Sequence, residues 1–205
     1  MTEKTMKSRR EEYADATRIA LLDAAQEQFV ALGYNQVGVE AISRSARVTR
    51  GAFYHHFADK PGLFDALVVR LQDGALAKVA SAVAESANSD MRLGVAAAAF
   101  LDVCVEPSYR RLVIGDAPAV LGAARCREIE DATVFGAMVA ALMARHKAGR
   151  FEVPDPKLAG RMIASMLCEA ALQLPEAKNP KQMRAHTLAI VATVLSAFDP
   201  GASGK

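Results

Sequence analysis

Arg50 and Tyr54 lie four residues apart in the sequence, as do Gly51 and His55, so a helix would gather all four on one side. An Arg guanidinium can bond O6 and N7 of guanine together, and a Tyr hydroxyl can reach a phosphate or a base edge. Gly51 adds little bulk, which lets the backbone approach another molecule closely. These groups suit a nucleotide duplex, although the same spacing also occurs on the surface of ordinary small helices.

The elements that would position these side chains are two short helices. Val39–Ser45 is expected to form the first, residues 46–48 a turn, and Thr49 is a good N-cap for the second. Phe53 and Phe57 are four apart on the opposite side of that second helix. Because so short a helix is not stable alone, the two rings must pack on preceding helices. The order is typical of a helix-turn-helix, whose second helix enters the major groove of DNA.

The rest of the chain also has helical spacing, and Ala, the best helix former, is abundant. Capping residues stand where the apolar segments begin or end: Ser8 with Glu11, Gly33, Asp59, Asp155 and Asn179. We therefore predict an all-α fold of about nine helices. After the two short helices, a long helix is expected from Asp59 past Val83. Two further helices are expected over 91–105 and from Pro107 to near Gly115, followed by a loop over 116–122. The last three helices are expected over 125–147, 156–174 and 180–198.

Charge supports this interpretation through its distribution. The formal net charge of +2 over 205 residues is too small to indicate a nucleic-acid partner by itself. Between residues 41 and 60, however, Arg44, Arg47, Arg50 and Lys60 face a single acid, Asp59. A second basic run, Lys4, Lys7, Arg9 and Arg10, lies near the N-terminus. Short clusters of this kind are often only solvated surface, so they add to the helix-turn-helix pattern without replacing it.

Other classes of protein are disfavoured. Cys104, Cys126 and Cys168 are widely spaced with no CxxC pair, which favours reduced thiols in the cytoplasm and predicts no metal site. No unbroken apolar run reaches the roughly 18 residues that a membrane span needs, and no secretion signal opens the chain. An all-helical enzyme is the rival interpretation, but no catalytic or cofactor motif supports it, and we predict neither catalysis nor a cofactor.

The sequence from Phe53 to Phe57, Phe-Tyr-His-His-Phe, followed by Lys60 and Leu63, resembles the F-Y-x-H-F-x-x-K-x-x-L signature of the tetracycline-repressor (TetR) family. Upstream residues match the same family at its own spacing: Ala24, Ala25, Phe29, Gly33, Tyr34, Ile42, Ala46, Val48 and Gly51. The resemblance covers residues 17–67. It implies a bacterial transcription regulator, most often a repressor, that binds double-stranded operator DNA.

The resemblance also assigns roles. The family positions that face the operator are matched by Thr49, Arg50, Gly51, Tyr54 and His55. The positions that commonly hold phosphates are matched by Tyr54 and by Lys60 at the start of the long helix. The basic segment adds Arg44 and Arg47 as further DNA-binding candidates. Three positions depart from the family pattern. Arg47 stands where Gly is frequent, Gly38 where Ser or Thr often caps, and Glu40 where some relatives read a base. An acid at 40 repels phosphate but can accept from cytosine N4.

A three-part organisation is expected. Residues 1–60 would form the DNA-binding domain, with 1–10 as a flexible basic arm. Residues 61–198 would bind an effector and dimerise, and 199–205 would be a disordered tail. Specific operators usually hold two half-sites, so we expect a homodimer. The candidate interface residues on the last two helices are Leu158, Leu167, Leu174, Leu188, Val191 and Leu195, unless those helices are simply buried within one chain.

The middle helices would enclose a pocket for a small apolar or amphipathic effector. Flexible or aromatic candidates for its lining are Phe100, Cys104, Phe135, Met138, Met162 and Met166, each of which also suits a plain core. In this hypothesis, effector binding tilts the long helix and changes the separation of the two recognition helices, which releases a palindromic operator. The alternative is a DNA-binding regulator without small-molecule input, which would have a filled C-terminal core.

Overall fold

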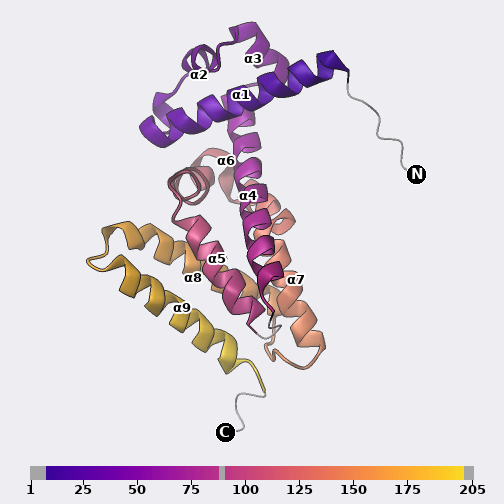
Figure 1. Ribbon diagram of the computed structural model, residues 1–205, viewed down its shortest axis with the longest axis vertical. Coiled ribbons are helices and arrows are strands. Elements are labelled where there is room, and N and C mark those ends of the chain that lie inside the picture. The colour runs from indigo at the N-terminus through magenta and orange to yellow at the C-terminus, as the bar shows by residue number, and fades with distance from the viewer. Residues whose placement is uncertain (1–7, 88–90, 201–205) are drawn as a thin grey trace. The chain divides into compact units, whose positions relative to one another are not determined.

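The computed structural model of the protein describes residues 8–87 and 91–200 (Figure 1). Over these residues the chain forms nine α-helices and no strand, which confirms the predicted all-α fold. It divides into two compact units between Val68 and Val69, so the first turns of the long helix α4 (Lys60–Glu85) belong to the N-terminal unit. None of the described helices is apolar over a length that would cross a bilayer.

Helix α1 (Arg9–Leu32) begins and ends at the residues that the sequence indicated. The Ser8 hydroxyl accepts from the amide of Glu11 at 3.3 Å, and the Ser8 amide donates to the Glu11 carboxylate at 2.7 Å, which completes a capping box. The helix ends at Gly33, whose φ of 89° suits a residue without a Cβ. Arg9 already lies in the first turn, so the predicted flexible arm is wrong for residues 8–10; residues 1–7 lie outside the described part.

The N-terminal unit places α2 (Val39–Ser45) and α3 (Arg50–His56) against α1. A short 3₁₀ turn (Tyr34–Gln36) precedes α2. The core is a set of fully buried apolar side chains from all of these helices and the start of α4: Leu21, Ala25, Phe29, Ile42, Phe53, Leu63, Phe64 and Leu67. The rings of Phe29, Tyr34 and Phe64 lie 4.9–5.6 Å apart, centroid to centroid.

The C-terminal unit contains the remaining helices, with bounds α5 (Arg92–Cys104), α6 (Ala117–Ala132), α7 (Val134–Lys147), α8 (Pro156–Gln173) and α9 (Pro180–Ala197). The predicted caps open the last two: Asp155 accepts from the amides of Lys157 and Leu158, and Asn179 accepts from that of Gln182. Helices α8 and α9 lie side by side as an antiparallel pair (Figure 1).

The segment from Tyr109 to Thr133 differs from the prediction. Tyr109–Asp116 is a π-helical segment, η2, and the expected loop over 116–122 is helical with a kink at Gly122, where φ is 80°. The single helix expected over 125–147 is broken at Thr133, whose backbone is not helical. The tail prediction is also wrong for its first residue: Asp199 pairs with Arg145 at 3.1 Å, whereas residues 201–205 lie outside the described part.

A buried polar node lies at the break at Thr133. The amide oxygen of Gln72 on α4 accepts from the Tyr109 hydroxyl at 3.0 Å and from the Thr133 hydroxyl at 3.3 Å. The Thr133 hydroxyl also lies 2.8 Å from the carbonyl of Ile129. All three side chains are buried, so this node satisfies polar groups that would otherwise be costly to bury.

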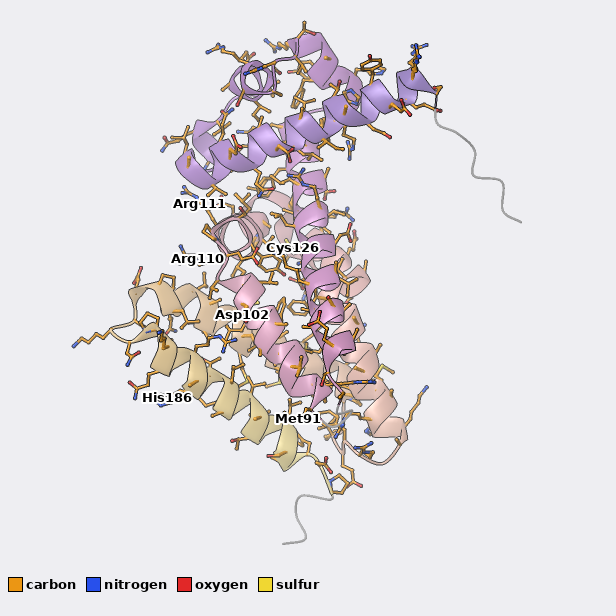
Figure 2. The ribbon with its side chains drawn as sticks, viewed as in Figure 1. Met91, Asp102, Arg110, Arg111, Cys126 and His186 are labelled. Carbon is orange, nitrogen blue, oxygen red and sulfur yellow. The ribbon has the colours of Figure 1, made fainter. Side chains whose placement is uncertain are left out.

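A surface ion pair joins α5 to α9. Both terminal oxygens of Asp102, whose position is marked in Figure 2, accept from the guanidinium of Arg184, each at 2.8 Å. The pairing is bidentate, the geometry in which an Arg–carboxylate pair is most specific. It links α9 to α5 at the surface.

Candidate functional site

The second helix of the helix-turn-helix, α3, is anchored by its two phenylalanines. Phe53 is completely buried and Phe57 is 5% exposed, with ring centroids 5.8 Å apart. The Arg18 guanidinium on α1 lies 4.5 Å above the Phe57 ring. The Thr49 hydroxyl accepts from the amide of Ala52 at 3.1 Å and so caps the helix. This arrangement fixes which side of α3 faces solvent.

The exposed side of α3 carries the four residues predicted to contact DNA. Arg50, Gly51, Tyr54 and His55 are all exposed, and Tyr54 keeps 46% of its surface accessible. The Tyr54 ring packs edge-on against the buried ring of Phe53, with 5.3 Å between the centroids, and the rest of its surface can contact a partner. The structure thus gathers these side chains on one face.

Arg50 is held by two neighbours. Its Nη2 donates to the Tyr54 hydroxyl at 3.3 Å, and its Nη1 lies 2.6 Å from the Glu40 carboxylate in the first turn of α2. The hydrogen bond with Tyr54, followed by the charge of Glu40, raises the pKa of Arg50. The guanidinium is therefore charged and oriented, while 62% of the Arg50 side chain remains exposed.

Two further exposed cations lie nearby: Arg44 in the last turn of α2 and Arg47 in the turn between α2 and α3. Arg47 has φ of 58°, and no other described non-glycine residue has a positive φ. The turn therefore accommodates a side chain in a backbone conformation that usually favours Gly.

Lys60 is placed differently from the expected phosphate contact. Its Nζ donates to the carbonyls of Tyr34 and Val37, both at 3.1 Å, and lies 4.1 Å from the centroid of the Tyr34 ring. Two of its three donors therefore serve the chain itself. The lysine ties the start of α4 to the segment before α2, and this internal role could not be read from the signature alone.

His56 lies at the edge of the core and is partly buried. Burial, with smaller contributions from His55 and Arg18, lowers the pKa of His56. A lowered pKa keeps the imidazole neutral near physiological pH, which suits a packing residue.

A cavity of about 270 Å³ lies within the C-terminal unit, between α4, α5, α7, α8 and Leu195 of α9. Its wall is apolar except for Arg92, which is exposed. Of the predicted lining, only Phe100 and Met138 reach the cavity. The lining includes Leu76, Val79, Val83, Leu93, Ala97, Val134, Ala137, Leu142, Ile163 and Leu167.

The other four predicted lining residues lie elsewhere. Cys104 and Phe135 are buried in the core, Met166 packs partly against it, and Met162 is 61% exposed. Helical spacing shows which residues share a face but not whether that face meets a void, a neighbouring helix or solvent.

Two family models match the chain. One, described as "Tetracyclin repressor-like, C-terminal domain", covers residues 91–198, and the other, "Bacterial regulatory proteins, tetR family", covers residues 21–67. The first alone spans more than half of the 205 residues. The chain belongs to the TetR family. This confirms the resemblance found in residues 17–67.

Curated TetR relatives match over part of their length. The chain is 37% identical over 65 residues to the HTH-type transcriptional regulator UidR of Escherichia coli (strain K12), covering 32% of this chain and 33% of UidR. It is 35% identical over 104 residues to the HTH-type transcriptional activator FasR of Mycolicibacterium smegmatis, covering 50% of this chain and 48% of FasR. The matched segments therefore span between a third and a half of these relatives.

Solved TetR structures match over nearly the whole chain. A regulator from Pectobacterium atrosepticum has a TM-score of 0.72 at 26% identity and covers 95% of this chain and 98% of its own. FadR from Bacillus subtilis, solved in complex with stearoyl-CoA, has a TM-score of 0.73 at 17% identity, with 87% and 97% covered. The FadR match shows a shared TetR fold.

The predicted dimerisation residues of this TetR chain separate into two groups. Leu167, Leu174 and Val191 are buried in its own core, so their assignment to an interface is wrong. Leu188 and Leu195 pack partly against that core, and Leu158 is 54% exposed. The exposed apolar residues on α8 and α9 are Leu158, Met162, Leu172 and Ile190. His186 projects from α9 away from α5 (Figure 2).

The three cysteines are free thiols, and two of them meet in the fold. Cys104 at the end of α5 is buried and hydrogen bonds with Cys168 on α8; this bond, followed by burial, raises the pKa of the Cys104 thiol. A protonated, buried thiol is a poor nucleophile. In the described stretches, no three His, Cys, Asp or Glu side chains gather in a way that could hold a metal ion.

Proposed function

We propose that this TetR-family chain is a homodimeric repressor that binds a palindromic operator through α3 and releases it when a small apolar or amphipathic molecule enters the C-terminal cavity. The observation that carries the proposal is the two-sided character of α3. Phe53 is fully buried on one side, while Arg50 and Tyr54 are exposed and joined to each other on the other.

The chemistry of the exposed side supports duplex binding. Arg50 can bond guanine in the major groove, and Arg44 and Arg47 lie close in sequence, where phosphates would be met. Thr49 and Tyr54 offer hydroxyls to the backbone or to base edges, and Gly51 leaves room for approach. Lys60 is proposed to position the start of α4 rather than to hold a phosphate, since its donors are engaged internally.

The outer faces of α8 and α9 support a dimer. Leu158, Met162 and Leu172 recur at helical spacing on the exposed side of α8, and Ile190 is exposed on α9. Ala185 and Ala189 on α9 are also exposed and small enough to let another helix approach closely. Pairing these faces with those of a second copy would form a four-helix bundle and remove the apolar surface from water.

The apolar cavity favours a ligand-responsive regulator over one controlled without a small molecule. A volume of about 270 Å³ is close to the lower limit of typical ligand pockets, roughly 300 Å³. Arg92 is the one charged residue among the lining, so it suits the polar end of an amphipathic molecule. Residues of α4 line the cavity, and the first turns of α4 belong to the DNA-binding unit. We propose that a ligand shifts α4 through its different affinities for two states.

Selection of bound sequences from random duplexes tests the DNA-binding part. The expected result is an enriched palindrome whose binding weakens steeply with salt. Arg50→Ala should cost about 1–3 kcal/mol at the selected site and relax base preference, whereas Arg44→Ala should weaken all sequences alike. If no duplex is enriched and binding is insensitive to salt, the proposed function is wrong.

Probes of the cavity test the ligand-responsive part. Decanol and decanoate share an apolar chain and differ in charge, so both should raise the melting temperature. Decanoate should raise it more than decanol because its carboxylate can pair with Arg92, and this difference should disappear in Arg92→Gln. The probe that binds should also release the selected operator. A cavity that binds neither probe, in a protein that binds its operator, would favour control without a small molecule.

A further inference from the structure

Glu40 is an unusual residue on the DNA-facing side of the N-terminal unit. It is the one acidic residue between positions 37 and 58, and it lies in a segment that contains Arg44, Arg47 and Arg50. Its side chain is 56% exposed. A carboxylate there would repel the phosphate backbone, so its presence calls for a compensating contact.

The contact in the free protein is with Arg50. The Glu40 Oε1 lies 2.6 Å from the Arg50 Nη1, and the pair links the first turn of α2 to the first residue of α3. Exposed pairs of this kind contribute only about 0–1 kcal/mol to stability. Glu40 also favours the dipole of α2 from its first turn and offsets the cation at the first residue of α3, each a small effect at an exposed site. A small stabilising role therefore leaves the exposed pair available to a partner.

Donor and acceptor capacity remains on both partners. The guanidinium has five N–H donors, of which Glu40 and the Tyr54 hydroxyl engage two, leaving enough to bond guanine O6 and N7 together. Among the described residues, Glu40 forms an ion pair with Arg50, and this pair uses the Glu40 Oε1. The carboxylate therefore retains lone pairs that can accept a further hydrogen bond.

A G·C base pair offers the complementary pattern. In the major groove, guanine presents the O6 and N7 acceptors and its cytosine presents the N4 donor, adjacent to O6 because the two atoms pair with each other. Resting on the proposed function, we propose that Glu40 and Arg50 act together as one reader of a G·C pair, with Arg50 on the guanine and Glu40 on the cytosine N4. Glu40 is then a specificity-determining residue as well as the group that orients Arg50.

Selection with matched variants tests the pair. Wild-type protein should enrich a palindrome with a fixed G·C pair in each half-site. Glu40→Ala should relax that one position, by roughly 5- to 100-fold in preference for G·C over the other pairs, and leave the remaining positions unchanged. Arg44→Ala, which removes a nearby exposed charge, should keep the preference and weaken all sequences alike.

A modified base separates the two contacts. Placing N4-methylcytosine at the fixed position removes the groove-facing N4–H but retains base pairing, so wild-type binding should weaken at that site and Glu40→Ala binding should not. Replacing the guanine with 7-deazaguanine should weaken both proteins because Arg50 loses an acceptor. Thermal melts serve as the folding control for each variant.

The outcomes separate this inference from the proposed function. If wild type enriches no duplex, both the proposed DNA-binding function and the inference about Glu40 and Arg50 are overturned. If wild type enriches a palindrome but Glu40→Ala keeps the same preference and binds every sequence more tightly, Glu40 is only a repulsive acid and this inference alone is overturned. Insensitivity of wild type to N4-methylcytosine at every G·C pair would overturn it equally.

Discussion

At the residue scale, the most telling position is Arg47. Its left-handed backbone conformation costs a non-glycine residue about 1–2 kcal/mol, and no contact among the described residues compensates for it at the side-chain terminus. The chain therefore retains a strained arginine in the turn beside Arg50. In the proposed function, a contact between the Arg47 guanidinium and a phosphate would offset this strain, and glycine could not make that contact.

Arg47→Gly should consequently stabilise the free protein and weaken its binding to DNA. Relief of the positive φ is expected to raise the free energy of unfolding by about 0.5–1 kcal/mol. Loss of the charge should reduce the slope of log affinity against log salt by about one. Arg44→Ala is the matched control, expected to reduce the slope without stabilising the fold. A less stable Arg47→Gly protein would contradict the strain argument.

His56 predicts a pH dependence at the same scale. Since burial lowers its pKa in the folded state, the unfolded chain binds a proton more readily as pH falls through the ordinary value of 6.5. The free energy of unfolding should therefore decrease as pH falls below that value and be retained above it. Urea unfolding at about pH 5 and about pH 8 should show a larger loss for wild type than for His56→Gln. Equal losses would show that His56 does not contribute.

At the element scale, the start of α4 depends on Lys60. Its ammonium donates to the carbonyls of Tyr34 and Val37, so removing it deprives the partly buried Val37 carbonyl of this donor and leaves the Tyr34 carbonyl with the Val37 amide at 3.4 Å. Such a loss typically costs about 1–3 kcal/mol. Lys60→Met should therefore lower the stability of the protein while leaving the salt slope of DNA binding nearly unchanged. If Lys60→Met instead reduces the slope of log affinity against log salt by one and keeps full stability, Lys60 contacts a phosphate.

The helix ends were largely predictable because their causes are local. Ser8, Thr49, Asp155 and Asn179 cap their helices through atoms two or three residues away, and a sequence displays that spacing directly. The break at Thr133 could not be predicted from local spacing, and the buried polar contacts at this point involve a residue distant in sequence. Thr133 bonds to Gln72, a partner that no local pattern identifies. The kink at Gly122 was mistaken for a loop since glycine marks both.

The candidate site divides in the same way. The exposed side of α3 followed from the two phenylalanines, which have only one way to face the core. The ion pair of Glu40 with Arg50 joins different helices and could not be predicted. The cavity lining was mostly missed because a void depends on how five helices pack together rather than on the composition of any one of them.

At the scale of the whole molecule, the exposed apolar face of α8 predicts assembly. Met162→Glu would place a charge in the proposed bundle, so sedimentation should show a monomer, whereas a dimer is expected for wild type. Met143 on α7 is also exposed, at 43%, and Met143→Glu is the matched control that should remain dimeric. If Met162→Glu remains a dimer like Met143→Glu, the interface lies elsewhere.

The buried node at Gln72 has a consequence for how α4 can move. The amide oxygen of Gln72 accepts from the Tyr109 hydroxyl and lies 3.3 Å from the Thr133 hydroxyl, so a rotation of α4 would alter both distances at once. In the ligand response that we propose, a shift of α4 would therefore have to change the contacts of Gln72 with Tyr109 and Thr133.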